Sequence, residues 1–142
     1  MDMEISFPGG KRVAARWDGQ SVETDQPVTL GGEAAAPAPY DLFLASLGTC
    51  AGIYALGFLQ ARGLPTEGLA LRQHVESDPT TGLATVVALE VTLPEGVPEK
   101  YRAGVLRAAE HCKVKKSLAA PPVFSVTLAP GSAEPATTSP GA

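Results

Sequence analysis

The sequence is poor in aromatic residues and in concentrated positive charge. Phe, Trp and Tyr make up 6% of the chain, which leaves little for a platform on which nucleic-acid bases could stack. Lys and Arg number 11 against 15 Asp and Glu, so the formal net charge is −4. A nucleic-acid binder needs a basic face that releases phosphate counterions. The composition therefore argues against a nucleic-acid partner.

The N-terminus also lacks the features of a secretory signal, because no basic segment and no apolar segment follows Met1. We therefore expect a cytoplasmic protein, in which thiols stay reduced. The two cysteines, Cys50 and Cys112, lie far apart and neither belongs to a Cys-x-x-Cys pair. Combined with His74 and His111 they match no established ligand spacing, so we expect neither a metal site nor a cofactor.

What the chain does have is the patterning of a single mixed domain with a real core, since 44% of its residues are hydrophobic. A helix is predicted from Pro98, and its apolar stripe reaches Cys112, which should face the core. Residues 129–142 are rich in Pro, Gly, Ser and Thr and are expected to form a tail, which leaves 1–128 as the domain. Alternating apolar residues predict strands over 3–7, 11–17, 21–24, 69–76, 83–93 and 123–128, with a hairpin turn at Asp18-Gly19.

The most apolar segment runs from Leu42 to Leu59 without a charged residue, and Gly63 ends it. A helix that is apolar on all sides either spans a membrane or is wholly buried. The patterned strands on both sides favour a buried helix in a soluble domain. Gly48 and Gly52 predict close packing of this helix against another helix, in the same chain or in a second copy.

Cys50 lies in the middle of this helix, and two interpretations remain open for it. It is either a small core side chain or a nucleophile, which requires a thiolate. The helix dipole has faded at this position, so activation needs a cation brought near by the fold. Arg16 and then Arg12, on an early strand, are the nearest candidates, although both can equally well face solvent. If Cys112 meets Cys50, it can capture a sulfenic acid as a disulfide.

Two segments together resemble a known family. They are PYDLFLASLGTC, which is Pro39–Cys50, and HCKV, which is His111–Val114, with Ser117-Leu118 just beyond. This combination is similar to the OsmC/Ohr family of thiol-dependent peroxidases, over about residues 10–128. The resemblance implies an α+β fold and an intertwined homodimer. In such a dimer the long central helix is buried, and antiparallel sheets from both subunits wrap around it.

The resemblance also implies roles for individual residues. Cys50 matches the peroxidatic cysteine that attacks an organic hydroperoxide, and Cys112 matches the resolving cysteine, whose disulfide a dithiol reductant reopens. Arg16, or failing that Arg12, is expected to hold the thiolate.

Three further residues are assigned through the same resemblance. Relatives often carry Glu directly after the proline to orient the arginine. Here Tyr40 stands at that place and the acid follows as Asp41, a rotation of about 100° on a helix. Asp41 is thus expected either to orient the arginine or only to cap the helix, and Tyr40 and Tyr54 are assigned to substrate binding.

Two alternatives remain. The Tyr at position 40 favours a member of the same fold that binds a small apolar ligand or a partner without turnover. The long apolar helix allows a membrane-associated protein.

Overall fold

The computed structural model describes residues 1–131 and has the predicted α+β class, with antiparallel sheets and helices. The C-terminal tail expected from residue 129 is described as far as 131, and residues 132–142 lie outside the described part. In chain order the elements are β1 (Glu4–Gly9), β2 (Arg12–Trp17), β3 (Gln20–Thr24), the 3₁₀ helix η1 (Val28–Leu30), α1 (Pro39–Gln60), β4 (Ala70–Ser77), β5 (Ala84–Thr92), α2 (Glu99–Glu110) and α3 (Lys113–Ala119).

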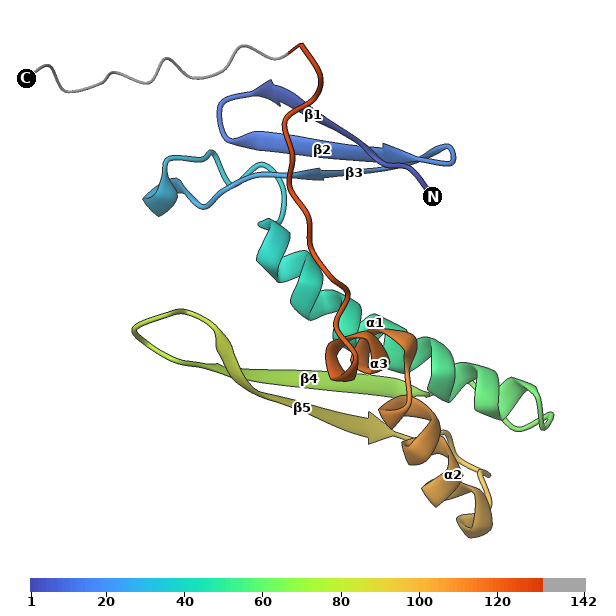
Figure 1. Cartoon of the computed structure of the whole chain (residues 1–142). Coiled ribbons are helices and arrows are strands. Elements are labelled where there is room, and N and C mark those ends of the chain that lie inside the picture. The colour runs from blue at the N-terminus through green and yellow to red at the C-terminus, as the bar shows by residue number, and fades with distance from the viewer. Residues whose placement is uncertain (132–142) are drawn as a thin grey trace, which may run out of the picture.

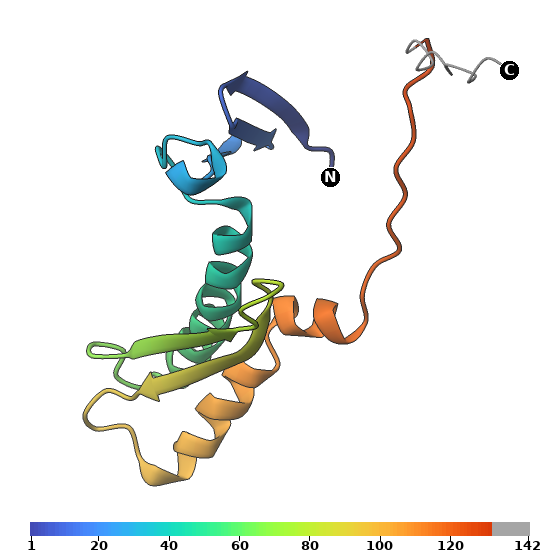
Figure 2. The ribbon, with the colours of Figure 1, turned by 90° about the vertical axis from the view of Figure 1, so that its left-hand side faces the viewer.

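Two separate antiparallel sheets form from strands that follow one another in the sequence. The first has the order β1-β2-β3, and Asp18 and Gly19 take the positive φ angles of 42° and 75° that the predicted hairpin turn requires. The second is the long hairpin β4-β5, in which His74 pairs with Ala88. Figures 1 and 2 show that the first sheet stands at the N-terminal end of α1, whereas β4, β5 and α2 flank its later turns.

The core lies between α1, α2 and the β4-β5 hairpin. Ala51, Ala55 and Leu59 of α1 pack there against Val105 and Ala109 of α2, and all of them are buried. The side chains of Leu71, Leu89 and Val91 close the cluster from the hairpin. The stripe predicted along the second helix is therefore confirmed, including a fully buried Cys112.

Helix α1 begins at Pro39, which is well suited to a first helical turn, and it ends before Gly63, whose φ is +61°. It is long and apolar enough to cross a membrane, but only 22% of its most apolar 18-residue stretch is buried inside the structure. Its buried residues, Leu47, Ala51, Ala55 and Leu59, recur every fourth position and form one stripe. Ile53 lies on the opposite face and is exposed, and Phe43 and Tyr54 are exposed at the edge of the stripe. Within one chain, burial on all sides is therefore not achieved.

The C-terminal part differs from the sequence prediction in two ways. The second helix stops at Glu110, and Cys112 precedes a short third helix that the sequence patterning did not indicate. The strand predicted over 123–128 is wrong, because no strand of the described chain lies beside it to share hydrogen bonds. Val123 and Val126 are each 97% exposed. This segment has the composition of a strand but lacks a neighbour in its own chain.

Candidate thiol site

The two thiols differ in burial. Cys50 is half-buried and lies among the residues of the outer face of α1, defined here as Phe43, Cys50, Ile53, Tyr54 and Gly57. Ile53 is 68% exposed and Tyr54 38%. Cys112 is fully buried at the junction of α2 and α3, and α3 packs against α1. Both cysteines are free in the structure.

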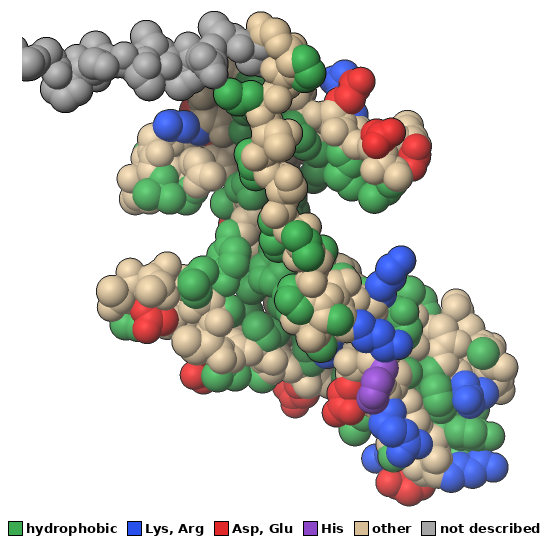
Figure 3. Space-filling view, viewed as in Figure 1, with side chains coloured by type: hydrophobic (Ala, Val, Ile, Leu, Met, Phe, Trp, Pro, Cys, Tyr) green, Lys and Arg blue, Asp and Glu red, His purple; other side chains and the backbone are tan. Residues whose placement is uncertain are grey.

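Positive charge surrounds the Cys112 junction. Lys115 Nζ donates a hydrogen bond of 3.2 Å to the Ala109 carbonyl near the C-terminus of α2, where the helix dipole favours a cation. Arg107 and Lys113 are exposed on the same stretch. Figure 3 shows that Lys and Arg side chains gather over α2 and α3.

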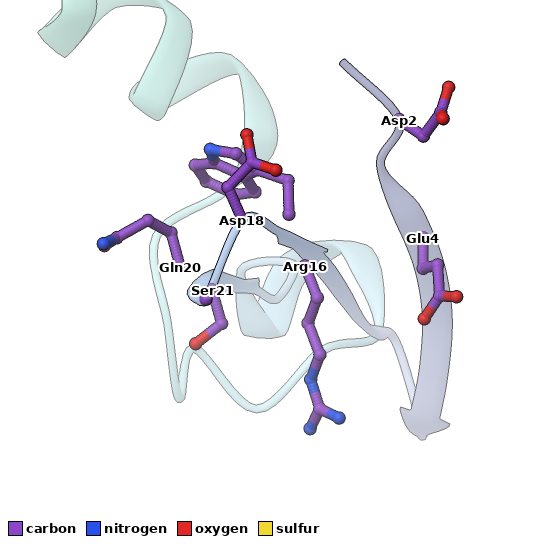
Figure 4. A pocket seen from close by; sticks show the side chains of 8 residues that line it. Asp2, Glu4, Arg16, Asp18, Gln20 and Ser21 are labelled. Carbon is purple, nitrogen blue, oxygen red and sulfur yellow. The ribbon is translucent and has the colours of Figure 1, made fainter.

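The two candidate arginines lie on β2 and have partners of their own. Arg12 forms an ion pair with Glu23 of β3, with 3.8 Å between Nη1 and Oε1. Arg16 pairs in register with Glu4 of β1 and lines an open pocket of about 590 Å³ with Asp2 and Asp18. Figure 4 shows its guanidinium pointing away from Asp18. No hydrogen bond or ion pair within residues 1–131 joins either arginine to Cys50.

Asp41 and Tyr40 form the first turn of α1. Asp41 is exposed there, and its charge suits the positive end of the helix dipole. The Tyr40 hydroxyl accepts a hydrogen bond of 2.8 Å from the Ala84 amide, and its ring stacks on Phe43 at 5.7 Å. Tyr40 therefore fastens the start of β5 to the start of α1. Its hydroxyl is already engaged, so a role in substrate binding would rest on the ring.

Tyr54 lies one turn beyond Cys50 on the outer face of α1. With Ile53, Gly57, Phe58 and Ala108 it lines an apolar groove of about 370 Å³. The structure thus places Tyr54 and Cys50 on one face, while Tyr40 and Asp41 lie at the start of the helix and the arginines on the first sheet.

A family model described as OsmC-like protein matches residues 31–127. The chain belongs to the OsmC-like protein family. A comparison with curated proteins found no match.

Two solved structures show the OsmC-like fold. One is a protein from Psychrobacter arcticus 273-4 assigned to the osmotic stress and detoxification response. It has a TM-score of 0.69 and 20% identity, over 81% of this chain and 85% of that one. The other is an organic hydroperoxide resistance protein OsmC from Legionella pneumophila, with a TM-score of 0.50 and 20% identity, over 83% and 89% of the two chains. At this identity the likeness establishes the fold.

Asp25 is a residue of this OsmC-like protein that the sequence patterning missed. It is buried, and its carboxylate accepts hydrogen bonds from the amides of Gln26, Glu33 and Ala35 at 2.7, 3.1 and 3.0 Å. The amide of Ala35 is the main cause that holds the pKa of Asp25 below its ordinary value. Asp25 thereby fixes the loop that joins the first sheet to α1. An Asp at the start of a long Gly- and Ala-containing loop was the available signal.

Gln73 is a second missed residue. Its Nε2 donates a hydrogen bond of 3.0 Å to the Leu44 carbonyl on α1, whereas its Oε1 is buried without a partner. Gly48 faces this side chain, so the close approach predicted from the glycines is to a strand and not to a helix of the same chain. Within residues 1–131 no group of three His, Cys, Asp or Glu side chains is placed to hold a metal ion.

Proposed function

We propose that this OsmC-like protein is a cytoplasmic cysteine-based peroxidase that reduces organic hydroperoxides in defence against oxidative stress. The observation that carries the proposal is the half-buried free thiol of Cys50 within an apolar face of α1. Apolar surroundings favour a peroxide with an organic chain over hydrogen peroxide. The Legionella protein of the same fold bears the name organic hydroperoxide resistance protein, which supports this substrate class.

The proposed reaction needs no cofactor. The Cys50 thiolate attacks one oxygen of the O–O bond, which breaks, and the other oxygen leaves with a proton as the alcohol. Cys50 is then a sulfenic acid. The Cys112 thiol attacks that sulfur, a disulfide forms and water leaves. A dithiol reductant reopens the disulfide, is itself oxidised to a disulfide, and returns both thiols.

We propose that the active form is an intertwined homodimer of one domain per chain, residues 1–128. The outer face of α1 exposes large apolar side chains that a second copy would cover, leaving the helix central and buried. The segment 123–128 has no strand neighbour within residues 1–131, and the sheets β1-β2-β3 and β4-β5 each end in an edge strand. In such a dimer Arg16 or Arg12 of one copy would approach Cys50 of the other. Burial of α1 against a second copy would also account for its apolar composition without a membrane.

The dimer is tested by placing a charge on the outer face. Ile53→Glu should shift the protein from dimer to monomer in sedimentation experiments, because a carboxylate would be buried without a partner. The matched control is Val28→Glu on η1, since Val28 is equally exposed at 71% but lies outside that face. A wild-type monomer, or equal behaviour of the two variants, would contradict the dimer.

The activity is tested by peroxide consumption with an alkyl hydroperoxide and a dithiol donor. Cys50→Ser should abolish consumption, whereas Cys112→Ser should retain one turnover and leave a sulfenic acid that a trapping reagent labels. Arg16→Ala and Arg12→Ala should show which arginine holds the thiolate, because only loss of that arginine should slow peroxide consumption. Arg72→Ala on β4 is the matched control. Consumption that is unchanged in Cys50→Ser would refute the proposal.

A second candidate is a protein of the same fold that binds a small apolar ligand or a partner without turnover. It is favoured by the engaged Tyr40 hydroxyl at the place where relatives often have Glu, and by the pairing of Arg12 with Glu23. Absence of consumption in a dimeric, fully reduced wild type would favour this candidate.

A further inference from the structure

Cys112 is fully buried although it lies at a bend and its neighbours in the sequence are exposed. Helix α2 ends at Glu110 and α3 begins at Lys113, and the backbone of Cys112 between them is extended, with a ψ angle of 153°. His111 and Lys113, on either side of it, are both exposed. The burial of this thiol therefore depends on where α3 is held relative to α2 and α1.

Helix α3 is weakly stabilised by its own residues. It has seven residues, and none of them is buried. Cys112 is its N-cap but makes no capping hydrogen bond, and the first turn holds Lys113 and no acidic residue, so the helix dipole is unfavourable there. A helix of this length is marginal in water without tertiary contacts. Opening α3 would therefore break few buried contacts.

Lys115 ties α3 back to α2. Its side chain is half-buried, and its Nζ donates the hydrogen bond of 3.2 Å to the carbonyl of Ala109, a buried residue near the end of α2. Ala109 and Lys115 lie on either side of Cys112 in the sequence, so this bond closes a loop around the bend that carries the thiol. The ammonium also lies near the negative end of the α2 dipole, which strengthens the tie.

We propose that Lys115 is a positioning residue that holds α3 closed over Cys112, and that α3 opens as a lid while the rest of the domain stays folded. The inference goes beyond the proposed function, because it concerns the reactivity of Cys112 whatever Cys50 reacts with. A buried thiol takes part in thiol chemistry only while it is accessible. Lys115 thus sets the fraction of time during which Cys112 is reactive.

The experiment measures alkylation of Cys112 in the reduced, full-length wild type. N-ethylmaleimide is added in the absence of peroxide, and mass spectrometry of the digested protein follows Cys50 and Cys112 separately. Rates are measured at urea concentrations below the unfolding transition. Opening of α3 alone exposes little surface, so alkylation of Cys112 should depend on urea much less steeply than global unfolding does.

Three lysine variants test the tie. Lys115→Met removes the donor and should raise the alkylation rate of Cys112 about fivefold, as loss of one hydrogen bond implies. Lys115→Arg keeps a cationic donor and should stay close to the wild type. Lys116→Met is the matched control, because Lys116 is an exposed lysine of the same helix and should change the rate much less.

A second set of variants tests whether α3 opens alone. Ser117 is exposed on α3, and the rate for Ser117→Gly should exceed that for Ser117→Ala about fivefold, since glycine weakens a helix relative to alanine. Ala103→Gly makes the matched change at an exposed position of α2. It should lower global stability but leave the alkylation rate of Cys112 unchanged.

A urea dependence as steep as that of global unfolding would overturn the inference, because Cys112 would then react only in the unfolded chain. Absence of Cys112 alkylation below the unfolding transition would do the same. Equal rates in Lys115→Met and Lys116→Met would remove the role of Lys115. An effect of Ala103→Gly as large as the difference between the Ser117 variants would show that α3 does not open alone. If Lys115→Met does not fold, the Ser117 pair and the urea dependence still decide. Since no peroxide is present, none of these outcomes bears on the proposed peroxidase activity.

Discussion

The contact between α1 and α2 at Gly104 allows a sharp prediction for Gly104→Ala. A Cβ built at Gly104 clashes with Phe58 Cζ and lies 2.8 Å from Cε2, whereas ordinary contact begins at about 3.4 Å. The Phe58 ring therefore has to move by about 1 Å. It is held by Arg62, whose guanidinium carbon is 3.6 Å from the ring centroid, and by the edge of Tyr101 at 6.4 Å.

Three contributions set the size of the effect. Replacing a helical glycine by alanine gains about 1 kcal/mol in helix propensity. Overpacking costs about 1–3 kcal/mol, and loss of the Arg62 contact adds about 0.5–1 kcal/mol. We expect Gly104→Ala to lower the free energy of unfolding by about 0.5–3 kcal/mol, which corresponds to a fall in Tm of about 1–12 °C.

The assay is urea unfolding of wild type, Gly104→Ala and the double variant Gly104→Ala with Phe58→Leu. The smaller side chain should relieve the clash, so the double variant should lose less stability than the sum of the two single changes. Gly52→Ala is the control, since it lies outside the outer face of α1 and its Cβ meets nothing within 4 Å, so it should stabilise the helix. A Gly104→Ala protein as stable as the wild type would refute the close packing of these two helices.

Two further changes test the loop and the start of α1. Asp25→Asn should destabilise the loop and speed hydrogen exchange at the Ala35 amide. The pKa of Asp25 in the folded wild type lies below its value of about 3.9 in the unfolded chain. The charged carboxylate therefore stabilises the fold at pH values above the unfolded pKa, and this stabilisation is lost as the pH falls through the folded pKa. The difference between wild type and Asp25→Asn in urea unfolding should therefore shrink under acid conditions, and a constant difference would contradict this role. Tyr40→Phe keeps the stacking on Phe43 but removes the acceptor for the Ala84 amide, so it should cost about 1 kcal/mol and expose that amide to exchange. Unchanged exchange at Ala84 would show that the bond contributes nothing.

Local patterns in the sequence anticipated much of the architecture. The alternation in β4 and β5 and the apolar stripe from Tyr101 to Cys112 depend on side chains that are close in sequence, and both appear in the structure as predicted. The start of α1 after Pro39 and its end before Gly63 follow from backbone preferences of single residues. The segment around Cys50, together with that around Cys112, was enough to indicate the family that the family model then matched.

The strand predicted over 123–128 shows where local patterns are insufficient. Val123 and Val126 have high strand propensity, but a strand also needs a neighbour to share its backbone hydrogen bonds, and the described part of the chain does not provide one. The same holds for α1, since its composition required cover on all sides and its own chain covers only one face.

The sequence by itself determined the order and type of most elements, the placement of Cys50 in an apolar helix and the burial of Cys112. Only the tertiary structure decided that Arg12 pairs with Glu23, that Asp25 fixes the loop before α1, and that Gln73 of β4 donates a hydrogen bond to the Leu44 carbonyl of α1. The physical reason is that periodicity reports which way a side chain faces along its own element. Which groups meet across elements depends on distances that only the folded chain sets.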